Sequence, residues 1–275
     1  MARLMRGHYW LPFSRVPALA AGAPPARVRL LGVNYVAWRA PDGRIGFIDE
    51  GCPHRGVSMA LARVEGCALR CLFHGWLIDV SGKCIEVPAE GERSAEIGAR
   101  VPVRHYPTVE KGGLIWVWLG EGEAAPFPDF AWLDLPEENI WMTRSVWPVN
   151  WLQGLEAAMD TAHVGHLHRG WHQPEATEDA GAGGHASLFA IQPRFEIEET
   201  AYGLRSAGVR KGEDGTSYVR ISEFLPPFTA MTPGSLDGAK GEASLYFFVP
   251  VDDRSHLQFF GFFSQHEQLG SFFMR

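Results

Sequence analysis

The chain has 275 residues, 46% of them hydrophobic and 21% charged, which is typical of a soluble globular protein with one large domain or two ordinary ones. Its net charge of −7 and the lack of a Lys- and Arg-rich run argue against a nucleic-acid partner. No apolar stretch approaches the ~20 residues that cross a bilayer, and no export signal is visible. We therefore expect a cytoplasmic protein without membrane contact, whose four cysteines are ligands or free thiols.

The first part of the sequence predicts short β-strands joined by turns. Residues 27–49 consist of apolar, β-branched and aromatic segments around a turn, which indicates a β-meander. A hairpin is predicted at 76–87, and a Lys-Gly-Gly turn leads into a strand within 111–119. The stretch 52–76, which holds three cysteines and two histidines, is therefore expected to lie on loops between strands.

A break in composition separates this part from the rest of the chain. GEGEAAPFPDF is rich in Gly, Pro and acidic residues, which is typical of a linker. We expect a first domain at 1–120, a linker at 121–135 and a second domain at 136–275.

The second domain is predicted to be α+β, with one long helix and an antiparallel sheet. NIWMTRSVW indicates a strand, and Asn150 is a plausible helix N-cap. Apolar residues then recur at helical spacing at Leu152, Leu155, Met159 and Ala162. Residues 173–187 are small, acidic and Gly-rich and predict a mobile loop, and the remainder alternates strands with turns.

Two close pairs of metal-ligating residues occur within 52–76. Cys52-x-His54 and Cys71-x-x-His74 have the composition of a Rieske [2Fe–2S] site, in which two cysteines hold one iron and two histidines the other. A structural zinc site is the alternative, although Cys-x-His is unusual as its first arm. The least favoured interpretation is that these four residues share no metal, because paired spacing of this kind is specific.

The mixed ligand set affects the reduction potential of such a cluster. Two neutral imidazoles in place of two anionic thiolates remove negative charge from the cluster, so the reduced form is easier to reach and the potential rises. Gly56 and Gly75, just beyond each pair, suit loops whose backbone approaches a cluster closely.

A second group of metal-ligating residues lies on the predicted helix. Glu156, Asp160 and His163 follow one another at i, i+4 and i+7, which places them on one helix face. Two histidines and a carboxylate are the ligand set of non-haem Fe(II) oxygenases. A solvated face is the alternative, but the helix is otherwise mostly apolar. Spacing alone does not decide whether the second histidine ligand is His166 or His168. His168 can be the ligand only if the helix distorts or ends before it.

These motifs give the chain a resemblance to a known family. CPHRG at 52–56, CLFHGW at 71–76 and NWLQGLEAAMDTAHVGHLH from 150 resemble the oxygenase component of Rieske non-haem iron aromatic-ring oxygenases, in the group of phthalate 4,5-dioxygenase and vanillate O-demethylase. The resemblance extends from 3–12 to 249–256. It implies a Rieske β-sandwich followed by a helix-grip catalytic domain, with a [2Fe–2S] cluster and a mononuclear Fe(II).

The resemblance also implies roles for individual residues. The family's D-x-x-H-x4-H pattern falls on Asp160, His163 and His168, so the two histidines hold the mononuclear iron and His166 is a neighbour. Asp160 then resembles the aspartate that bridges a cluster histidine of one subunit to an iron histidine of the next, in a head-to-tail homotrimer.

One family feature is not found in the sequence. The third iron ligand of the family is an aspartate in a helical segment after the last strands, whereas this sequence ends at SFFMR inside the predicted sheet. Asp252 and Asp253 come too early and are not assigned. We therefore expect a C-terminally incomplete catalytic domain, or an iron site without its carboxylate.

The resemblance implies an oxygenase that receives electrons from a separate NAD(P)H-dependent reductase or ferredoxin. With O2 it would hydroxylate, dihydroxylate or O-demethylate a small aromatic substrate. No nucleotide-binding fingerprint accompanies GAGGHA at 181–186, which agrees with a separate reductase. The alternative is a Rieske electron-transfer protein without oxygenase activity, because the third ligand is not in the chain.

Overall fold

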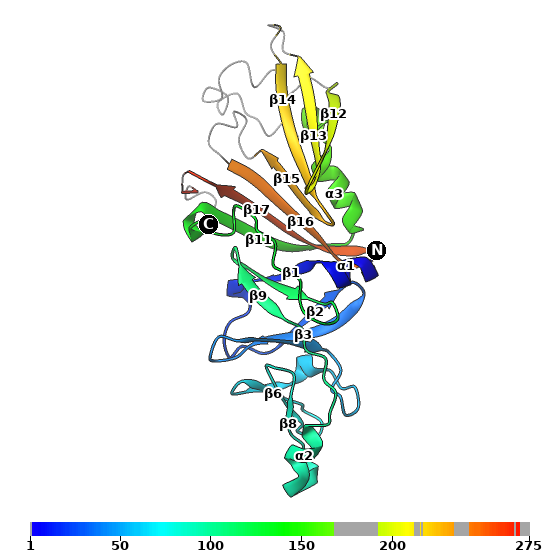
Figure 1. The fold of residues 1–275 in the computed structure, drawn as a ribbon, viewed down its shortest axis with the longest axis vertical. Coiled ribbons are helices and arrows are strands. Elements are labelled where there is room, and N and C mark those ends of the chain that lie inside the picture. Colours follow the sequence, from blue (N-terminus) through cyan, green and yellow to red (C-terminus); the bar gives the residue numbers. More distant parts are fainter. Residues whose placement is uncertain are drawn as a thin grey trace. The chain divides into compact units, whose positions relative to one another are not determined.

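A computed structural model describes residues 2–167, 192–211, 215, 217–233, 242–266 and 268–269. The chain forms two compact units: unit 1 comprises Met1–Pro128 with Val249–Asp253, and unit 2 comprises Asp129–Phe248 with Arg254–Arg275. Strands dominate both units and helices are few, so the predicted α+β class is confirmed (Figure 1). In the described ranges no helix has both the length and the apolar character needed to span a membrane.

Unit 1 is built from three small sheets and several short helices. The sheets are β1(Trp10–Arg15)-β10(Leu114–Trp118)-β9(Thr108–Lys111), β2(Ala26–Leu30)-β3(Val33–Arg39)-β4(Ile45–Asp49), and β5(Arg63–Glu65)-β6(Ala68–Arg70)-β7(Leu77–Asp79)-β8(Cys84–Glu86). The helices are α1(Ala2–His8), η1(Val16–Ala18), η2(Met59–Leu61), η3(Pro88–Arg93) and α2(Ser94–Gly98). The predicted meander is β2–β4, the predicted hairpin is β7–β8, and the strand after the Lys-Gly-Gly turn is β10.

Strand β1 was not predicted, and its sequence explains why. Pro12 lies in the middle of WLPFSR and cannot donate a ladder hydrogen bond, so a strand is disfavoured locally. β1 forms because it pairs with β10. The register of this pairing shifts between Pro12 and Ser14, which accommodates the proline.

Unit 2 contains a single seven-stranded antiparallel sheet with the order β11-β17-β16-β15-β14-β13-β12. Its strands are β11(Ile140–Trp147), β12(Arg194–Thr200), β13(Gly203–Lys211), β14(Ser217–Leu225), β15(Thr229–Pro233), β16(Glu242–Asp252) and β17(Ser255–Ser264). Among its described residues, three short helical elements accompany the sheet, η4(Glu137–Asn139), α3(Trp151–Met159) and α4(Val164–Leu167). The loop predicted at 173–187 lies outside the described residues.

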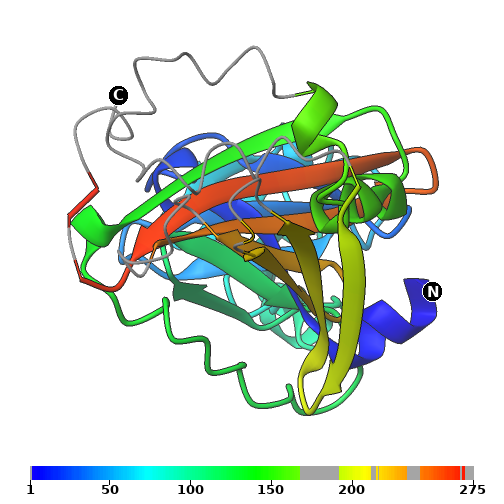
Figure 2. The same ribbon diagram turned by 90° about the horizontal axis from the view of Figure 1, so that it is seen from above.

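Helix α3 covers one face of this sheet. It begins where the sequence predicts, because the Asn150 Oδ1 accepts a hydrogen bond from the Leu152 N–H at 3.0 Å. Leu155 is buried against Ala230 and Phe248 of the sheet. Figure 2 shows the green helix lying along the yellow-to-orange strands, in agreement with its contacts to β14, β15 and β17.

The predicted helix face of Glu156, Asp160 and His163 is wrong, because α3 ends at Met159. Asp160 is extended (φ −76°, ψ 113°), and its Oδ1 accepts a hydrogen bond from the Ala162 N–H at 2.7 Å. This local bond competes with the helix, which is why aspartate often ends one. His163 therefore lies in a turn between α3 and α4.

Candidate functional site

The two loops of the first motif have the same backbone geometry. In each loop the cysteine N–H donates to a carbonyl five residues later, and a glycine N–H donates back to the cysteine carbonyl. The pairs are Cys52 N–Val57 O (2.8 Å), Gly56 N–Cys52 O (2.8 Å), Cys71 N–Trp76 O (2.9 Å) and Gly75 N–Cys71 O (3.1 Å). Both glycines have left-handed backbones, with φ of 73° at Gly56 and 74° at Gly75, a region in which residues with a Cβ are strained.

These loops bring the thiols together and the imidazoles together. Cys52 and Cys71 are buried, at 4% and 3% exposure, and both are free thiols. Burial, together with its neighbour Cys71, raises the pKa of Cys52 to about 11. The rings of His54 and His74 are 4.6 Å apart, and His54 stacks on Trp76 at 4.7 Å. Metal binding at the cysteines must therefore displace thiol protons.

The donor set fits a [2Fe–2S] cluster. The Nδ1 atom of His54 is buried and has no hydrogen-bond partner in the described part of the chain, which leaves a nitrogen lone pair for a metal. Burial, followed by the charge of His74, lowers the pKa of His54 and so favours the neutral ligand form. Among the described residues no three His, Cys, Asp or Glu side chains converge on one point. Each iron of a Rieske cluster needs only two protein ligands.

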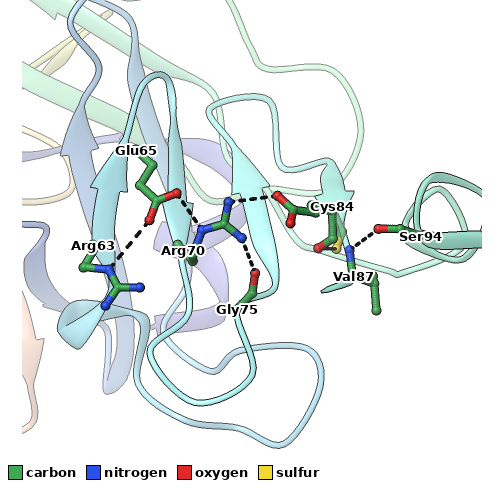
Figure 3. Close-up of polar contacts among 8 residues, drawn as sticks. Arg63, Glu65, Arg70, Gly75, Cys84, Val87 and Ser94 are labelled. Carbon is green, nitrogen blue, oxygen red and sulfur yellow. Dashed lines mark hydrogen bonds and ion pairs between the residues drawn. The ribbon is translucent and has the colours of Figure 1, made fainter. Parts of the chain in front are cut away.

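Arg70 braces the second loop (Figure 3). Its Nη1 donates to the Gly75 carbonyl at 2.8 Å, while its Nε and Nη2 pair with Glu65 at 2.6 Å and Glu86 at 2.8 Å. The arginine lowers the pKa of Glu86. Because the side chain of Arg70 is only 19% exposed, these bonds are better shielded from water than ordinary surface pairs. The guanidinium therefore ties the end of the cluster loop to two strands.

We expect Arg70→Lys to loosen this loop. Lysine keeps the charge but loses the planar fork that reaches three acceptors at once. The free energy of unfolding should fall by about 1–2 kcal/mol, and visible absorbance of the purified protein should bleach faster in air. The matched control is Arg63→Lys, because Arg63 is 64% exposed and, within the part of the chain that the structure describes, its one ion pair is a contact of 3.6 Å with Glu65. Equal behaviour of the two variants would contradict the bracing role.

The structure places Asp160 and His163 side by side. The Asp160 Oδ2 lies 3.4 Å from the His163 Nδ1, and the two side chains are 46% and 32% exposed. His166 follows on α4, where its N–H donates to the His163 carbonyl. His168, the other candidate for the second histidine, lies outside the described residues.

A buried contact anchors the turn that carries these residues. The Arg210 Nη2 on β13 donates to the Thr161 carbonyl at 2.5 Å and to its Oγ1 at 3.1 Å. Burial lowers the pKa of Arg210, while the charge of Asp160 acts in the opposite direction. On the same strand, a Cβ at Gly208 would lie 2.4 Å from the Thr161 Cγ2. Thr161 is thus held against the sheet by one glycine and one buried cation.

His163 also lines a cavity in unit 2 of about 380 Å³. The cavity lies between α3 and the strands it faces. Its walls are formed by Trp147, Val149, Gln153, Gly154, Ala157, Ala158, His163, Tyr246, Phe248, His256 and Gln258. A largely apolar cavity with a few polar groups is the usual form of a small-molecule site.

Sequence reasoning missed three residues of this site. Arg210, Gly208 and His256 lie on strands far along the chain, and their roles depend on contacts across the sheet. Alternation along β13 could have placed Arg210 and Gly208 on one face, but not against Thr161.

The sequence matches two consecutive protein families. The Rieske [2Fe-2S] domain matches residues 9–107, and the family described as LigXa C-terminal domain like matches residues 117–271. Among solved structures, a Pseudomonas putida CBB5 NdmA mutant with theobromine is 21% identical, with a TM-score of 0.73 over 98% of this chain and 77% of that one. Dicamba monooxygenase bound to dicamba is 19% identical, with a TM-score of 0.72 over 94% and 77%. These two likenesses concern the fold.

Relatives of higher identity are oxygenase subunits. The 3-chlorobenzoate-3,4-dioxygenase oxygenase subunit of Comamonas testosteroni is 37% identical over 94% of this chain and 59% of the relative. The phthalate 4,5-dioxygenase oxygenase subunit of Pseudomonas putida is 35% identical over 94% and 60%. The chain thus spans about three fifths of the length of these curated relatives. The match to residues 117–271 covers more than half of the chain, so the chain belongs to the family described as LigXa C-terminal domain like, with a Rieske [2Fe-2S] domain before it.

Proposed function

We propose that this chain serves in the oxygenase component of a Rieske non-haem iron system, which uses O2 to hydroxylate, dihydroxylate or O-demethylate a small aromatic substrate. The observation that carries the proposal is the joint presence of a buried cysteine pair beside a histidine pair in unit 1 and of His163 on a cavity wall in unit 2. The relatives named after 3-chlorobenzoate and phthalate favour an aromatic substrate.

Each metal group has its own residues in this proposal. Cys52, Cys71, His54 and His74 would hold a [2Fe–2S] cluster, which supplies one-electron transfer when bound. His163 and His168 would hold Fe(II), which supplies the O2 chemistry when bound. The third carboxylate ligand is not assigned to any residue of this sequence. We propose a Rieske domain at 1–120, a linker at 121–135 and a catalytic domain at 136–275.

Asp160 is proposed to connect subunits. Its Oδ2 lies beside His163, and its exposed carboxylate leaves an acceptor for a partner's imidazole. His74 is exposed, so it is available for such a contact. We infer a head-to-tail homotrimer in which Asp160 of one subunit hydrogen-bonds a cluster histidine of the next. A separate NAD(P)H-dependent reductase or ferredoxin would supply the electrons.

The test is the metal content of the purified chain. After anaerobic purification, iron, acid-labile sulfide and the visible spectrum are measured per chain. Three irons for two sulfides are expected if both groups are bound. Two irons for two sulfides would favour the alternative, an electron-transfer protein without oxygenase activity. A colourless zinc protein would contradict both.

We expect Asp160→Asn to slow electron delivery at least tenfold without loss of either metal. The amide keeps the shape and an oxygen for the Ala162 N–H, but it loses the charge that favours a hydrogen bond from imidazole. Stopped-flow oxidation of the reduced cluster in a single turnover measures the rate. Glu156→Gln, an exposed residue on the preceding helix turn, is the matched control. Normal cluster oxidation in Asp160→Asn would rule out the bridging role.

A further inference from the structure

The indole of Trp76 connects the two loops that carry the cysteine and histidine pairs. The backbone of Trp76 belongs to the second loop, because its carbonyl accepts a hydrogen bond from the Cys71 N–H at 2.9 Å. Its ring instead stacks on His54 of the first loop, with ring centres 4.7 Å apart and planes that differ by 6°. The side chain is half-buried and packs against the core of unit 1 that includes Cys52 and Cys71. Trp76 therefore contacts both that core and a proposed cluster ligand.

This contact restricts the orientation of the His54 ring. The terminal torsion of a histidine side chain has broad minima, so packing decides where its ring nitrogens point. The buried Nδ1 of His54 has no hydrogen-bond partner among the described residues that could fix it. A rotation of the imidazole out of the stacked plane would push its edge into the indole, which the core holds in place. The indole thus holds this nitrogen in one direction.

His74 has different surroundings from His54. Both His74 and its neighbour Phe73 are exposed, and their rings meet at 4.0 Å with an angle of 46° between the planes. His54 is less exposed and has the parallel indole on one face. The two histidines of the motif are therefore not equivalent, because one is open to solvent and the other is covered by a side chain of its own domain.

The face of the Trp76 indole carries a partial negative charge, so it stabilises positive charge on the ring that stacks on it. An imidazole bound to ferric iron carries more positive charge than one bound to ferrous iron, so the indole favours the oxidised form. The indole also excludes water from this side of the ring. A cluster with two thiolates and two neutral imidazoles has no net charge when oxidised and one negative charge when reduced, and water stabilises that charge. Both effects make reduction harder.

We propose that Trp76 is a positioning residue that holds the His54 imidazole in its ligating orientation and lowers the reduction potential of the cluster. This inference rests on the cluster ligands of the proposed function and adds a residue that tunes their chemistry. Trp76 binds no metal itself and acts through His54. A lower potential makes the reduced cluster a stronger electron donor to the next acceptor.

The test compares the reduction potential of the purified full chain with that of two variants. Trp76→Leu keeps an apolar side chain but removes the aromatic face, whereas Trp76→Phe keeps a smaller aromatic face. Each protein is titrated anaerobically with dithionite and redox dyes, and the visible spectrum gives the ratio of reduced to oxidised cluster. At the wild-type midpoint potential this ratio should rise at least about threefold in Trp76→Leu, the effect of one aromatic contact, and by less in Trp76→Phe.

EPR spectra of the reduced proteins report the orientation of the His54 ring. The wild type and Trp76→Phe should each give one narrow set of g values, because the imidazole has one orientation. The signal of Trp76→Leu should broaden, because the ring is no longer held against an aromatic face. Leu72→Ala is the control, since Leu72 is an aliphatic side chain of the same loop, 51% exposed, and its loss should change neither the potential nor the spectrum.

Several results would overturn the proposal. These are an unchanged or lowered potential in Trp76→Leu, an unbroadened EPR signal in that variant, or an equal shift of the potential in Leu72→Ala. If Trp76→Leu retains no acid-labile sulfide, Trp76→Phe decides: a raised potential supports the role, and an unchanged one overturns it. Failure of the proposed function is read separately, because a wild-type chain without sulfide would contradict the cluster itself.

Discussion

Replacement of Cys71 by serine is expected to abolish the visible absorbance and the acid-labile sulfide of the purified chain. Cys71 is 3% exposed, and its backbone forms both hydrogen bonds of the second loop. Serine preserves the size of the side chain but not the soft thiolate that Fe–S clusters require. With one ligand of the cysteine-held iron missing, the remaining residues cannot retain the cluster. Sulfide content should fall by at least about tenfold.

Cys84→Ser is the matched control for this experiment. Cys84 is also buried, at 4% exposure, and its Sγ makes a long contact of 3.7 Å to the Glu86 carbonyl (Figure 3). The change should cost about 1 kcal/mol of unfolding free energy through a poorly satisfied hydroxyl, and the sulfide content should stay normal. Loss of sulfide in Cys84→Ser, or its retention in Cys71→Ser, would mean that the ligands are assigned wrongly.

The second large effect is expected from Gly208→Ala. The added methyl carbon would lie 2.4 Å from the Thr161 Cγ2, and Thr161 is 3% exposed, so the turn must move away from β13. Overpacking of this kind costs about 1–3 kcal/mol. The displacement also weakens the Arg210 hydrogen bonds to Thr161 and shifts the turn that carries His163. We expect a lower free energy of unfolding in urea and at least about tenfold weaker retention of the mononuclear iron, with normal sulfide.

A double-mutant cycle tests whether the clash with the Thr161 methyl group causes the losses expected in Gly208→Ala. Thr161→Ser removes the Cγ2 methyl group but keeps the Oγ that accepts from Arg210. In the Gly208→Ala background this second change should restore most of the lost stability and iron, whereas alone it should cost about 1 kcal/mol. Additive losses in the double mutant would show that the clash with Thr161 is not the mechanism.

The hydrogen bonds of the buried Arg210 side chain to Thr161 offset part of the cost of its burial. A buried guanidinium is costly unless its hydrogen bonds are satisfied, and Thr161 supplies two acceptors at one point of the turn. The charge of Asp160 opposes the lowering of the Arg210 pKa that burial causes. The contact of Arg210 with Thr161 therefore fixes the position of the turn.

Local patterns allowed much of this protein to be predicted from its sequence. The meander of β2–β4, the β7–β8 hairpin and the start of α3 follow from side-chain alternation, turn residues and one capping asparagine. Cys52 with His54, and Cys71 with His74, are neighbours along the chain, so each pair could be proposed without knowledge of the fold. The family and the α+β class followed from these short motifs.

Only the tertiary structure decided the features that depend on distant residues. The end of α3 at Met159 is set by the Asp160 side chain together with an arginine from β13, about fifty residues further along the chain, so helical periodicity extended the helix too far. β1 forms despite Pro12 because β10 pairs with it. The tautomer of His256 depends on a carbonyl of another element. Each of these is a contact between groups that the sequence separates, and periodicity carries no information about such contacts.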